Sequence, residues 1–251
     1  MTYQAIKFGR LLLLSVLLGY LGGQILHEAG HWAILQLYRR APLMSFTGLV
    51  QQDEPPAHSE GWTQFTTPDG EQVWLHLASL PGSSAEWIAM LAAGPLAQVA
   101  VMILGLVLAR FGKREPVRVI GLLLALINSF GPILYQSRSM LGEGGGDEYF
   151  IAQFLGLPKY MIHLPILLIS IAGFVVGLWS LAEWRTRLKW IGAVCIGFVG
   201  QGPLLMFANR ITQTQVSLGN PLFRSVFGWS LPVMVVNVVV AFILVVVWMR
   251  W

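Results

Sequence analysis

The sequence predicts an all-α polytopic membrane protein with about six transmembrane helices and a small β-hairpin element in the loop after the first span. Two observations lead to this prediction. The 251 residues are 55% hydrophobic and only 11% charged, whereas soluble domains carry roughly 25% charged residues. In addition, six apolar segments are long enough to cross a bilayer, which takes about 20 residues. They cover residues 11–38, 85–109, 117–135, 161–182, 188–208 and 227–249.

The first segment follows Lys7 and Arg10 and resembles a signal peptide in this respect. However, no small-residue cleavage site follows, and the apolar run continues to Leu37. We therefore interpret it as a retained first span. A helix over residues 11–38 would be about 42 Å long, so we expect it to tilt or to protrude from the bilayer.

Two polar connections between the spans contain further structure. Residues 41–83 include "WTQFTTPDGEQVWLHLA", in which a Pro-Asp-Gly turn between β-prone runs predicts a hairpin over about 62–78. The "LMSFTGLV" run upstream is a further strand candidate. Residues 137–158 hold a glycine cluster, two acids and an apolar-periodic stretch, which predict a loop that enters a short helix.

The spans themselves carry few polar or helix-breaking residues. In "AMLAAGPLAQVAV", residues 92–94 form a small-residue face that allows another helix to approach closely. In "LLLALINSFGPILYQ", Asn128 and Pro132 predict a helix broken inside or near the membrane. Gln201 and Asn237 in the later spans either line a gate or simply pack.

The "HEAGH" run in the first span places three ionisable residues inside an apolar segment. His27 and His31 are four residues apart, so a helix presents both imidazoles on one face to a single cation. Glu28 lies next to His27, close enough to act on a water bound to that cation. This is the HExxH arrangement of zinc hydrolases. Ionisable residues inside membranes are costly and usually functional.

A catalytic zinc needs a third protein ligand besides the two histidines. Asp147 is attractive because the glycines at 144–146 let its backbone approach the site. The other interpretation of this segment is an acidic, solvated loop. The candidates for the third ligand are Asp147, Glu148, Glu143, His58 and His76.

Three motifs occur in order along residues 11 to about 157: "HEAGH", "AAGPLAQ" and "LLLALINSFGP…GGD". In this order they resemble the site-2 protease family of intramembrane zinc metalloproteases. The resemblance implies that His27, His31 and Asp147 bind one zinc ion per chain and that Glu28 is the general base. It also implies that Asn128 contacts the substrate backbone near the metal.

The resemblance implies an intramembrane endopeptidase that cleaves transmembrane or membrane-proximal segments of membrane proteins. Residues 1–157 would form a three-span metalloprotease core that includes the β-type loop at 41–83, and residues 158–251 would add three transmembrane helices. An unwound substrate could pair with an exposed strand edge, for which the hairpin around 62–78 is a candidate. The expected partners are such a membrane-protein substrate and the lipid bilayer.

Two other functions are consistent with the same motif. One is a metal-ion transporter that uses the HEAGH helix, and the other is a catalytically inactive membrane-binding homologue. A transporter would need a second ligand-rich helix, yet segments two to six contain only His163 and no acid in mid-span. The intact His27, Glu28 and His31 argue against an inactive homologue.

The net charge of +4 follows the ends of the apolar runs, so it indicates topology and not nucleic-acid binding. Ten of the 16 Lys and Arg lie on the side of the N-terminus, and six lie on the side of the 41–83 loop. The positive-inside rule alone would therefore place the site outside the cell. The family resemblance implies a bacterial or archaeal-type cell membrane with the site reached from the cytosol, and we follow it.

Overall fold

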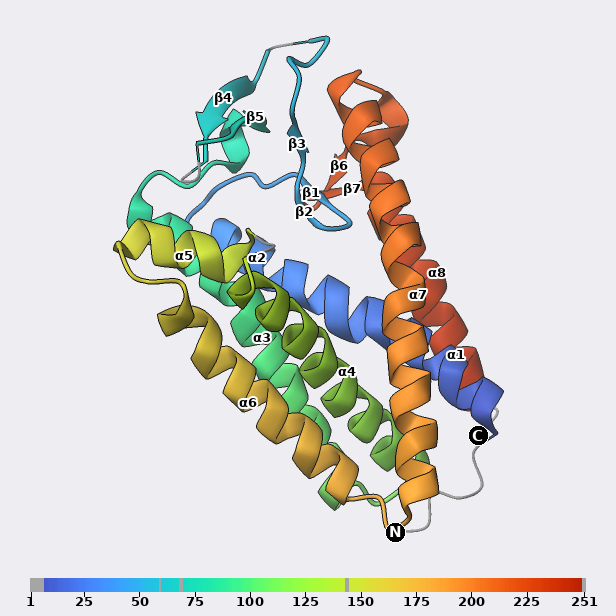
Figure 1. Cartoon of the computed structure of the whole chain (residues 1–251). Coiled ribbons are helices and arrows are strands. Elements are labelled where there is room, and N and C mark those ends of the chain that lie inside the picture. The colour runs from blue at the N-terminus through green and yellow to red at the C-terminus, as the bar shows by residue number, and fades with distance from the viewer. Residues whose placement is uncertain (1–6, 59, 68–69, 143–144, 250–251) are drawn as a thin grey trace.

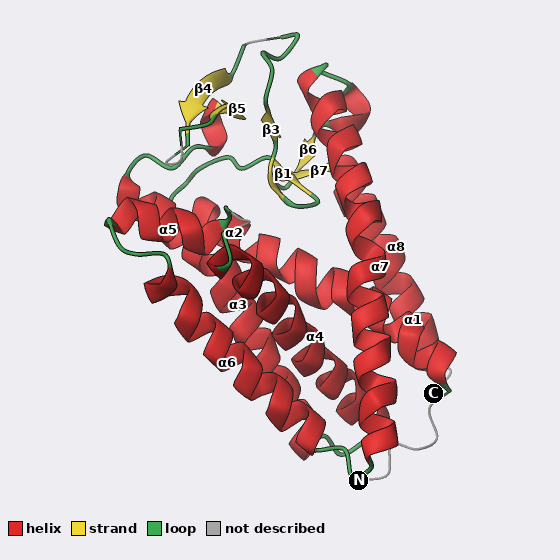
Figure 2. Ribbon diagram, viewed as in Figure 1, coloured by secondary structure: helices red, strands yellow, loops and turns green. Residues whose placement is uncertain are grey.

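The computed structural model describes residues 7–58, 60–67, 70–142 and 145–249. Six helical stretches in this part of the chain are long and apolar enough to span a membrane, which confirms the predicted fold class. The architecture is that of an integral, multi-pass membrane protein with a small β element at one end (Figures 1 and 2). The six stretches are Phe8–Leu37, Ser84–Phe111, Glu115–Met140, Tyr160–Trp179, Trp184–Ser217 and Leu231–Met249.

The first span is built from three consecutive helical pieces. α1 (Phe8–Leu18) and α2 (Leu26–Leu37) are α-helical, and Gly19–Ile25 between them form a π-helix. π-Helical turns are rare and occur frequently at functional sites. Because a π-turn holds more residues than an α-turn, this segment sets the direction in which α2 presents the HEAGH side chains that follow.

The remaining spans surround the first one on two sides (Figure 1). α3 (Ser84–Phe111), α4 (Glu115–Met140) and α6 (Tyr160–Trp179) pack together, and α2 lies against α3. α7 (Trp184–Ser217) packs mainly against α1, and α8 (Leu231–Met249) lies beside α1 as well. The first span therefore lies between the group formed by α3, α4 and α6 and the pair formed by α7 and α8.

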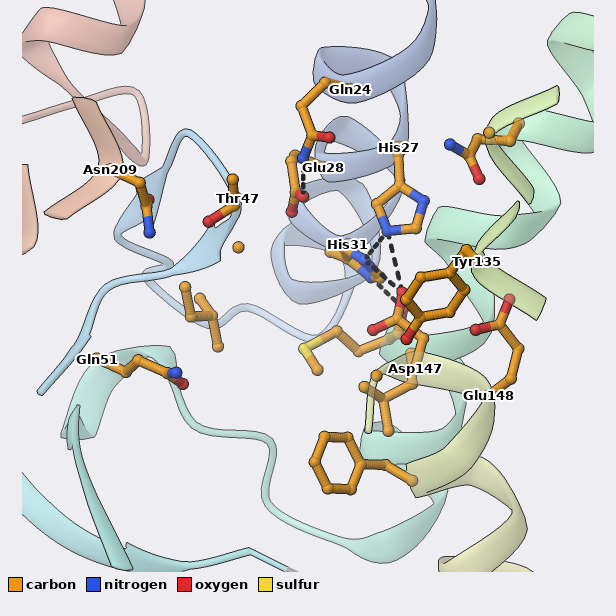
Figure 3. A pocket seen from close by; sticks show the side chains of 18 of the residues that line it. Gln24, His27, Glu28, His31, Thr47, Gln51, Tyr135, Asp147, Glu148 and Asn209 are labelled. Carbon is orange, nitrogen blue, oxygen red and sulfur yellow. Dashed lines mark hydrogen bonds and ion pairs between the residues drawn. The ribbon is translucent and has the colours of Figure 1, made fainter. Parts of the chain in front are cut away.

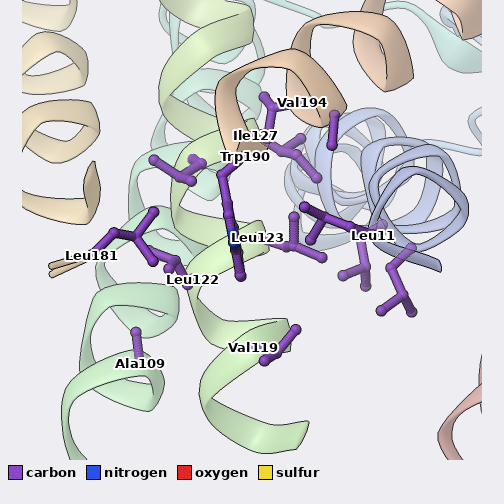
Figure 4. Packing of buried hydrophobic residues seen from close by; sticks show 13 residues of the cluster. Leu11, Ala109, Val119, Leu122, Leu123, Ile127, Leu181, Trp190 and Val194 are labelled. Atoms are coloured by element: carbon purple, nitrogen blue, oxygen red, sulfur yellow. The ribbon is translucent and has the colours of Figure 1, made fainter. Parts of the chain in front are cut away.

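The apolar core lies where α1, α4 and α7 meet. Leu11, Leu123 and Trp190, one from each helix, are completely buried there (Figure 4). Lipid tails are as apolar as leucine, so close packing rather than removal from water holds such helices together. The fifth span is thus packed into the same core as the first and third spans.

Two small sheets lie at one end of the helices (Figure 2). The predicted hairpin is confirmed as β4 and β5, which pair antiparallel, and "LMSFTGLV" supplies two short strands, β1 and β2. The first sheet has the order β2-β1-β7-β6, from β2 (Gly48–Leu49), β1 (Met44–Ser45), β7 (Trp229–Ser230) and β6 (Ser225–Val226). The second has the order β3-β5-β4, from β3 (Gln51–Gln52), β5 (Gln72–His76) and β4 (Trp62–Thr66).

The β6–β7 hairpin corrects the predicted start of the last span. The apolar run places that span at 227–249, but Phe227 and Gly228 form a turn with positive φ angles of 53° and 86°. The span begins only at Leu231. Trp229 is apolar because it is buried in the sheet, where it pairs with Met44 of β1.

The predicted break in the third span is wrong, because α4 continues as one helix through Pro132. Proline removes only the hydrogen bond to the carbonyl of Asn128, four residues earlier. Neighbouring side chains bond to carbonyls of the same helix, with Asn128 donating to Leu124 O at 2.9 Å and Ser129 donating to Ala125 O at 2.8 Å. Packing of α4 against α3, α6 and α7 therefore outweighs the local preference of Pro132.

Candidate metal centre

His27 and His31 lie one turn apart on α2, and their rings meet edge to face with centroids 4.7 Å apart. Their Nε2 atoms are 3.0 Å from each other. The Nδ1 atom of His31 lies 2.7 Å from the carbonyl oxygen of Met90 on α3. A carbonyl only accepts, so Nδ1 carries the proton and Nε2 keeps its lone pair for a metal.

Asp147 completes the group from α5 (Asp147–Leu155), the predicted short helix. Its Oδ2 atom lies 3.0 Å from His27 Nε2 and 3.2 Å from His31 Nε2 (Figure 3). Burial favours a higher pKa for Asp147, but its interactions with the neighbouring imidazoles, His31 first, hold its pKa well below the usual range. The carboxylate is thus ionised, which is the form that binds a metal.

The arrangement of these three side chains fits a zinc ion. Bonds of about 2.0–2.1 Å in a tetrahedron would place the ligand atoms about 3.3–3.4 Å apart, close to the separations observed. One ligand atom from each residue lies within 4.8 Å of the other two. The sequence-predicted set of His27, His31 and Asp147 is therefore brought together as a possible metal-binding triad.

The small-residue face predicted on the second span lies directly against this triad. A Cβ atom placed on Gly94 of α3 would lie 2.5 Å from the ring of His31 and 2.7 Å from Cε1 of His27. On the facing helix, a Cβ on Gly30 would lie 2.4 Å from the carbonyl oxygen of Ala93. Only glycine at both positions lets α2 and α3 come close enough for Met90 to reach His31.

Glu28 is 4% exposed and lines the same cavity as the triad. Its Oε1 atom accepts a hydrogen bond of 2.8 Å from Gln24, one turn earlier, and Gln24 also donates to Phe46 O at 3.3 Å. The Oε2 atom of Glu28 has no hydrogen-bond partner among the described residues. One oxygen is therefore anchored while the other is left for a ligand in the cavity.

The other candidates for the third ligand lie elsewhere. Glu148 is turned away from the histidines (Figure 3), and Gln136 donates to its Oε1 at 2.5 Å. Burial, together with the charge of Asp147, raises the pKa of Glu148. His76 packs edge-on against Trp62. His58 lies beside Gly219, and Glu143 falls outside the described residues.

Asn128, the predicted substrate contact, is not brought to the triad. Its side chain is 2% exposed, donates to its own helix at Leu124 and is not part of the cavity lining. Its neighbours Ile127 and Gly131 do line the cavity. A direct contact with substrate therefore stays a prediction, and the cavity wall at this height of α4 is formed by these neighbours.

The triad opens into a cavity of about 650 Å³ that several unpredicted residues line. Tyr135 of α4 lies next to Asp147 in Figure 3 and donates to Gly145 O at 2.6 Å. Gln201 also lines the cavity, whereas Asn237 packs between helices and accepts from Tyr20 at 2.6 Å. The polarity of Gln201 in an apolar run was the available signal. No feature of the sequence around Tyr135 indicated that it belongs to the site.

Comparisons of the chain with protein-family models, with curated proteins and with solved structures find no match. A fold alone does not determine a function, so the residues of the site have to carry the functional conclusion.

Proposed function

We propose that the chain is a zinc-dependent intramembrane endopeptidase that cleaves transmembrane or membrane-proximal segments of membrane proteins. The observation that carries the proposal is the meeting of His27, His31 and Asp147 in a cavity that Glu28 also lines. Three protein ligands leave one position of a tetrahedral zinc free, as catalytic zinc sites require.

Each group of this site has a separate role in peptide hydrolysis. Zinc held by the triad would supply a Lewis acid that polarises the scissile carbonyl and lowers the pKa of a water molecule to about 7. Glu28 takes a proton from the attacking water with Oε2 and passes it to the leaving amine. Gln24 holds the other oxygen of Glu28, and Met90 holds the ring of His31 in position.

The position of the strands supports an extended substrate. A transmembrane helix hides its carbonyls in its own hydrogen bonds, so it has to unwind before cleavage. An unwound stretch can add to a sheet edge. β2 and β3 are edge strands, and Gly48, Leu49 and Gln51 from these strands line the cavity. The predicted hairpin supplies a further edge strand, β4, and its Phe65 lines the same cavity.

The two other functions receive less support. A transporter needs a further set of ligands along its path, but among the described residues the triad is the only group of three or more His, Cys, Asp and Glu close enough to hold a metal. An inactive homologue has no use for the anchored Glu28. By the family resemblance, we place the protein in a bacterial or archaeal-type cell membrane, with the site reached from the cytosol.

The test is cleavage of a generic single-span substrate in proteoliposomes, together with metal analysis of the purified protein. The wild type is expected to hold one zinc per chain and to cleave. Glu28→Gln is expected to keep its zinc and to lose about 10²-fold or more in rate, because only the proton transfer is removed. Glu60→Gln, in the exposed loop, is the matched control.

Variants of the ligands separate the metal from the base. His27→Ala and Asp147→Asn are expected to lose zinc as well as activity, whereas Glu148→Gln keeps the metal because its side chain faces Gln136. Cleavage by Glu28→Gln at the wild-type rate would show that the hydrolytic mechanism is wrong. Loss of zinc from Glu148→Gln but not from Asp147→Asn would move the third ligand by one residue.

A further inference from the structure

The cavity extends from the triad to α7. This helix contains none of the sequence motifs and none of the residues that act in the proposed hydrolysis. Gln201, Asn209 and Gln213 line it from this helix. They follow one another at spacings of eight and four residues, so they project from one side of α7. Gln201 lies inside the apolar run 188–208, where an amide is expensive unless it meets a polar partner, and Asn209 and Gln213 follow in the polar end of the helix. We refer to these three residues as the amide face.

The polarity of the amide face indicates the kind of group that it binds. No lysine or arginine lines the described cavity, and its acidic residues are Glu28, Asp147 and Glu148 at the metal end. Along α7 the ligand therefore meets no charge. A side-chain amide both donates and accepts hydrogen bonds, as does a peptide unit. Phe198 on the same helix offers apolar surface near Gln201, and Phe65 lines another part of the wall, where it stacks on Trp87 of α3.

Two of the amides each have one polar atom that can bond to a ligand. Gln201 is 8% exposed, and its Oε1 atom has no hydrogen-bond partner among the described residues. The side chain of Gln201 lies against Gly19 of the π-helix, where an added Cβ would be 2.9 Å from its Nε2. Asn209 accepts a hydrogen bond of 2.5 Å from Ser45 of β1, and it reaches from α7 toward Thr47 in Figure 3. This bond occupies the Asn209 oxygen and leaves its Nδ2 donor for the cavity.

We propose that the amide face binds the unwound backbone of the substrate over an uncharged, apolar stretch of a transmembrane segment. This inference rests on the proposed function, and it names the substrate class of that site. The stretch lies in the cavity, along the edge strand β2 and the amide face. Its peptide groups bond to Gln201, Asn209 and Gln213, and its apolar side chains lie against the aromatic wall. A charged side chain in this stretch finds no counter-ion there.

Cross-linking tests the binding surface without any need for hydrolysis. Cys195 is the only cysteine, so a Cys195→Ser, Glu28→Gln background accepts a single new thiol. Gln213→Cys in this background is combined in proteoliposomes with a single-span peptide that carries one cysteine at successive positions. We expect disulfide formation over a short central stretch. The matched control is Thr214→Cys, on the exposed side of α7, which is expected to give a severalfold lower yield.

Kinetics in the Glu28 wild-type background supply the second measurement. Gln201→Leu and Gln213→Leu are expected to raise KM about five- to tenfold each, from the loss of a hydrogen bond to the substrate, with kcat nearly unchanged. Thr214→Val is the control, and an unchanged zinc content shows that each variant is folded. A lysine placed in the cross-linking stretch of the peptide is expected to abolish the cross-link.

The outcomes are distinguishable. Equal cross-linking by Gln213→Cys and Thr214→Cys, or unchanged KM values, would overturn the amide face as a binding surface. If the peptide cross-links as expected but the wild type cleaves nothing, the endopeptidase proposal fails while the binding surface stands. If the lysine-bearing peptide cross-links equally well, the restriction to uncharged stretches is wrong.

Discussion

Gly94 is the residue whose size the candidate metal centre tolerates least. Any Cβ at this position would contact both imidazoles, at 2.5 Å from His31 and 2.7 Å from His27 Cε1. These contacts are closer than van der Waals separation, so the rings would have to turn away from Asp147. The small-residue face of α3 is therefore a requirement of the metal centre as much as of helix packing.

Gly94→Ala is expected to reduce the zinc content about tenfold or more, because misplaced ligands commonly weaken metal binding by 10- to 100-fold. Alanine is intrinsically better in a helix by about 1 kcal/mol, so the substitution does not weaken α3 itself. The measurement is zinc per chain after dialysis against a weak chelator. Gly192→Ala on α7 is the matched control, since an added Cβ there meets nothing within 4 Å. Equal zinc content in both variants would contradict this account of Gly94.

α5 is the element that brings the third ligand to the site, and a chain of buried polar side chains ties it to two spans. Gln136 of α4 donates to Glu148 of α5, and its oxygen lies 2.5 Å from Nδ1 of His163 on α6. All three side chains are at most 3% exposed. Since Glu148 follows Asp147 directly, the bond to Gln136 fixes the start of α5 and with it the carboxylate that faces the histidines. Gln136 is thus a positioning residue.

Gln136→Leu is expected to lower the free energy of unfolding by about 1–3 kcal/mol, because it leaves Glu148 and His163 buried without their partner. It should also weaken zinc binding. Thermal unfolding and metal analysis measure the two effects. Gln153→Leu, on the exposed side of α5, is the control. A Gln136→Leu protein that unfolds earlier but binds zinc like the wild type would limit Gln136 to a structural role.

Elements whose signal is local could be predicted from the sequence. Hydropathy located the spans, and the spacing of His27 and His31 located two ligands, because both depend on residues within a few turns of one another. The β6–β7 hairpin could not be predicted, since its partner β1 lies about 180 residues away and Trp229 is as apolar as a membrane-facing residue. For the same reason the amide face had no motif. The three amides can be recognised as one surface only when α7 is packed opposite the metal centre.

At the scale of the whole molecule, α7, β7 and α8 from the second half of the chain contact the elements around the site. β7 pairs with β1, Asn209 accepts from Ser45, and Asn237 accepts from Tyr20. The chain from 158 to 251 therefore shapes the cavity that residues 1–157 would close only in part. The side of the membrane to which this shared cavity opens is the remaining property on which the identity of the substrates depends.

The orientation follows from two arguments that disagree. The cation count favours a site outside the cell, and the family resemblance favours the cytosol. One of the six cations on the site side, Arg40, is bonded to Glu86 at 2.8 Å and so contributes to packing at the start of α3. The positive-inside rule reflects only a bias in the number of Lys and Arg, so a difference of ten cations to six does not outweigh the resemblance. We therefore expect the loop at 41–83 in the cytosol.

Thiol labelling in whole cells decides the orientation. In a Cys195→Ser background, Glu60→Cys, in the exposed part of the site-side loop, is expected to resist a membrane-impermeant reagent in intact cells and to react after lysis. Lys113→Cys, in the exposed loop between α3 and α4, is the opposite-side control and should react in intact cells. The reverse pattern would place the cavity on the outer face. The substrates would then be segments presented from outside, and the positive-inside rule would have been the better guide for this chain.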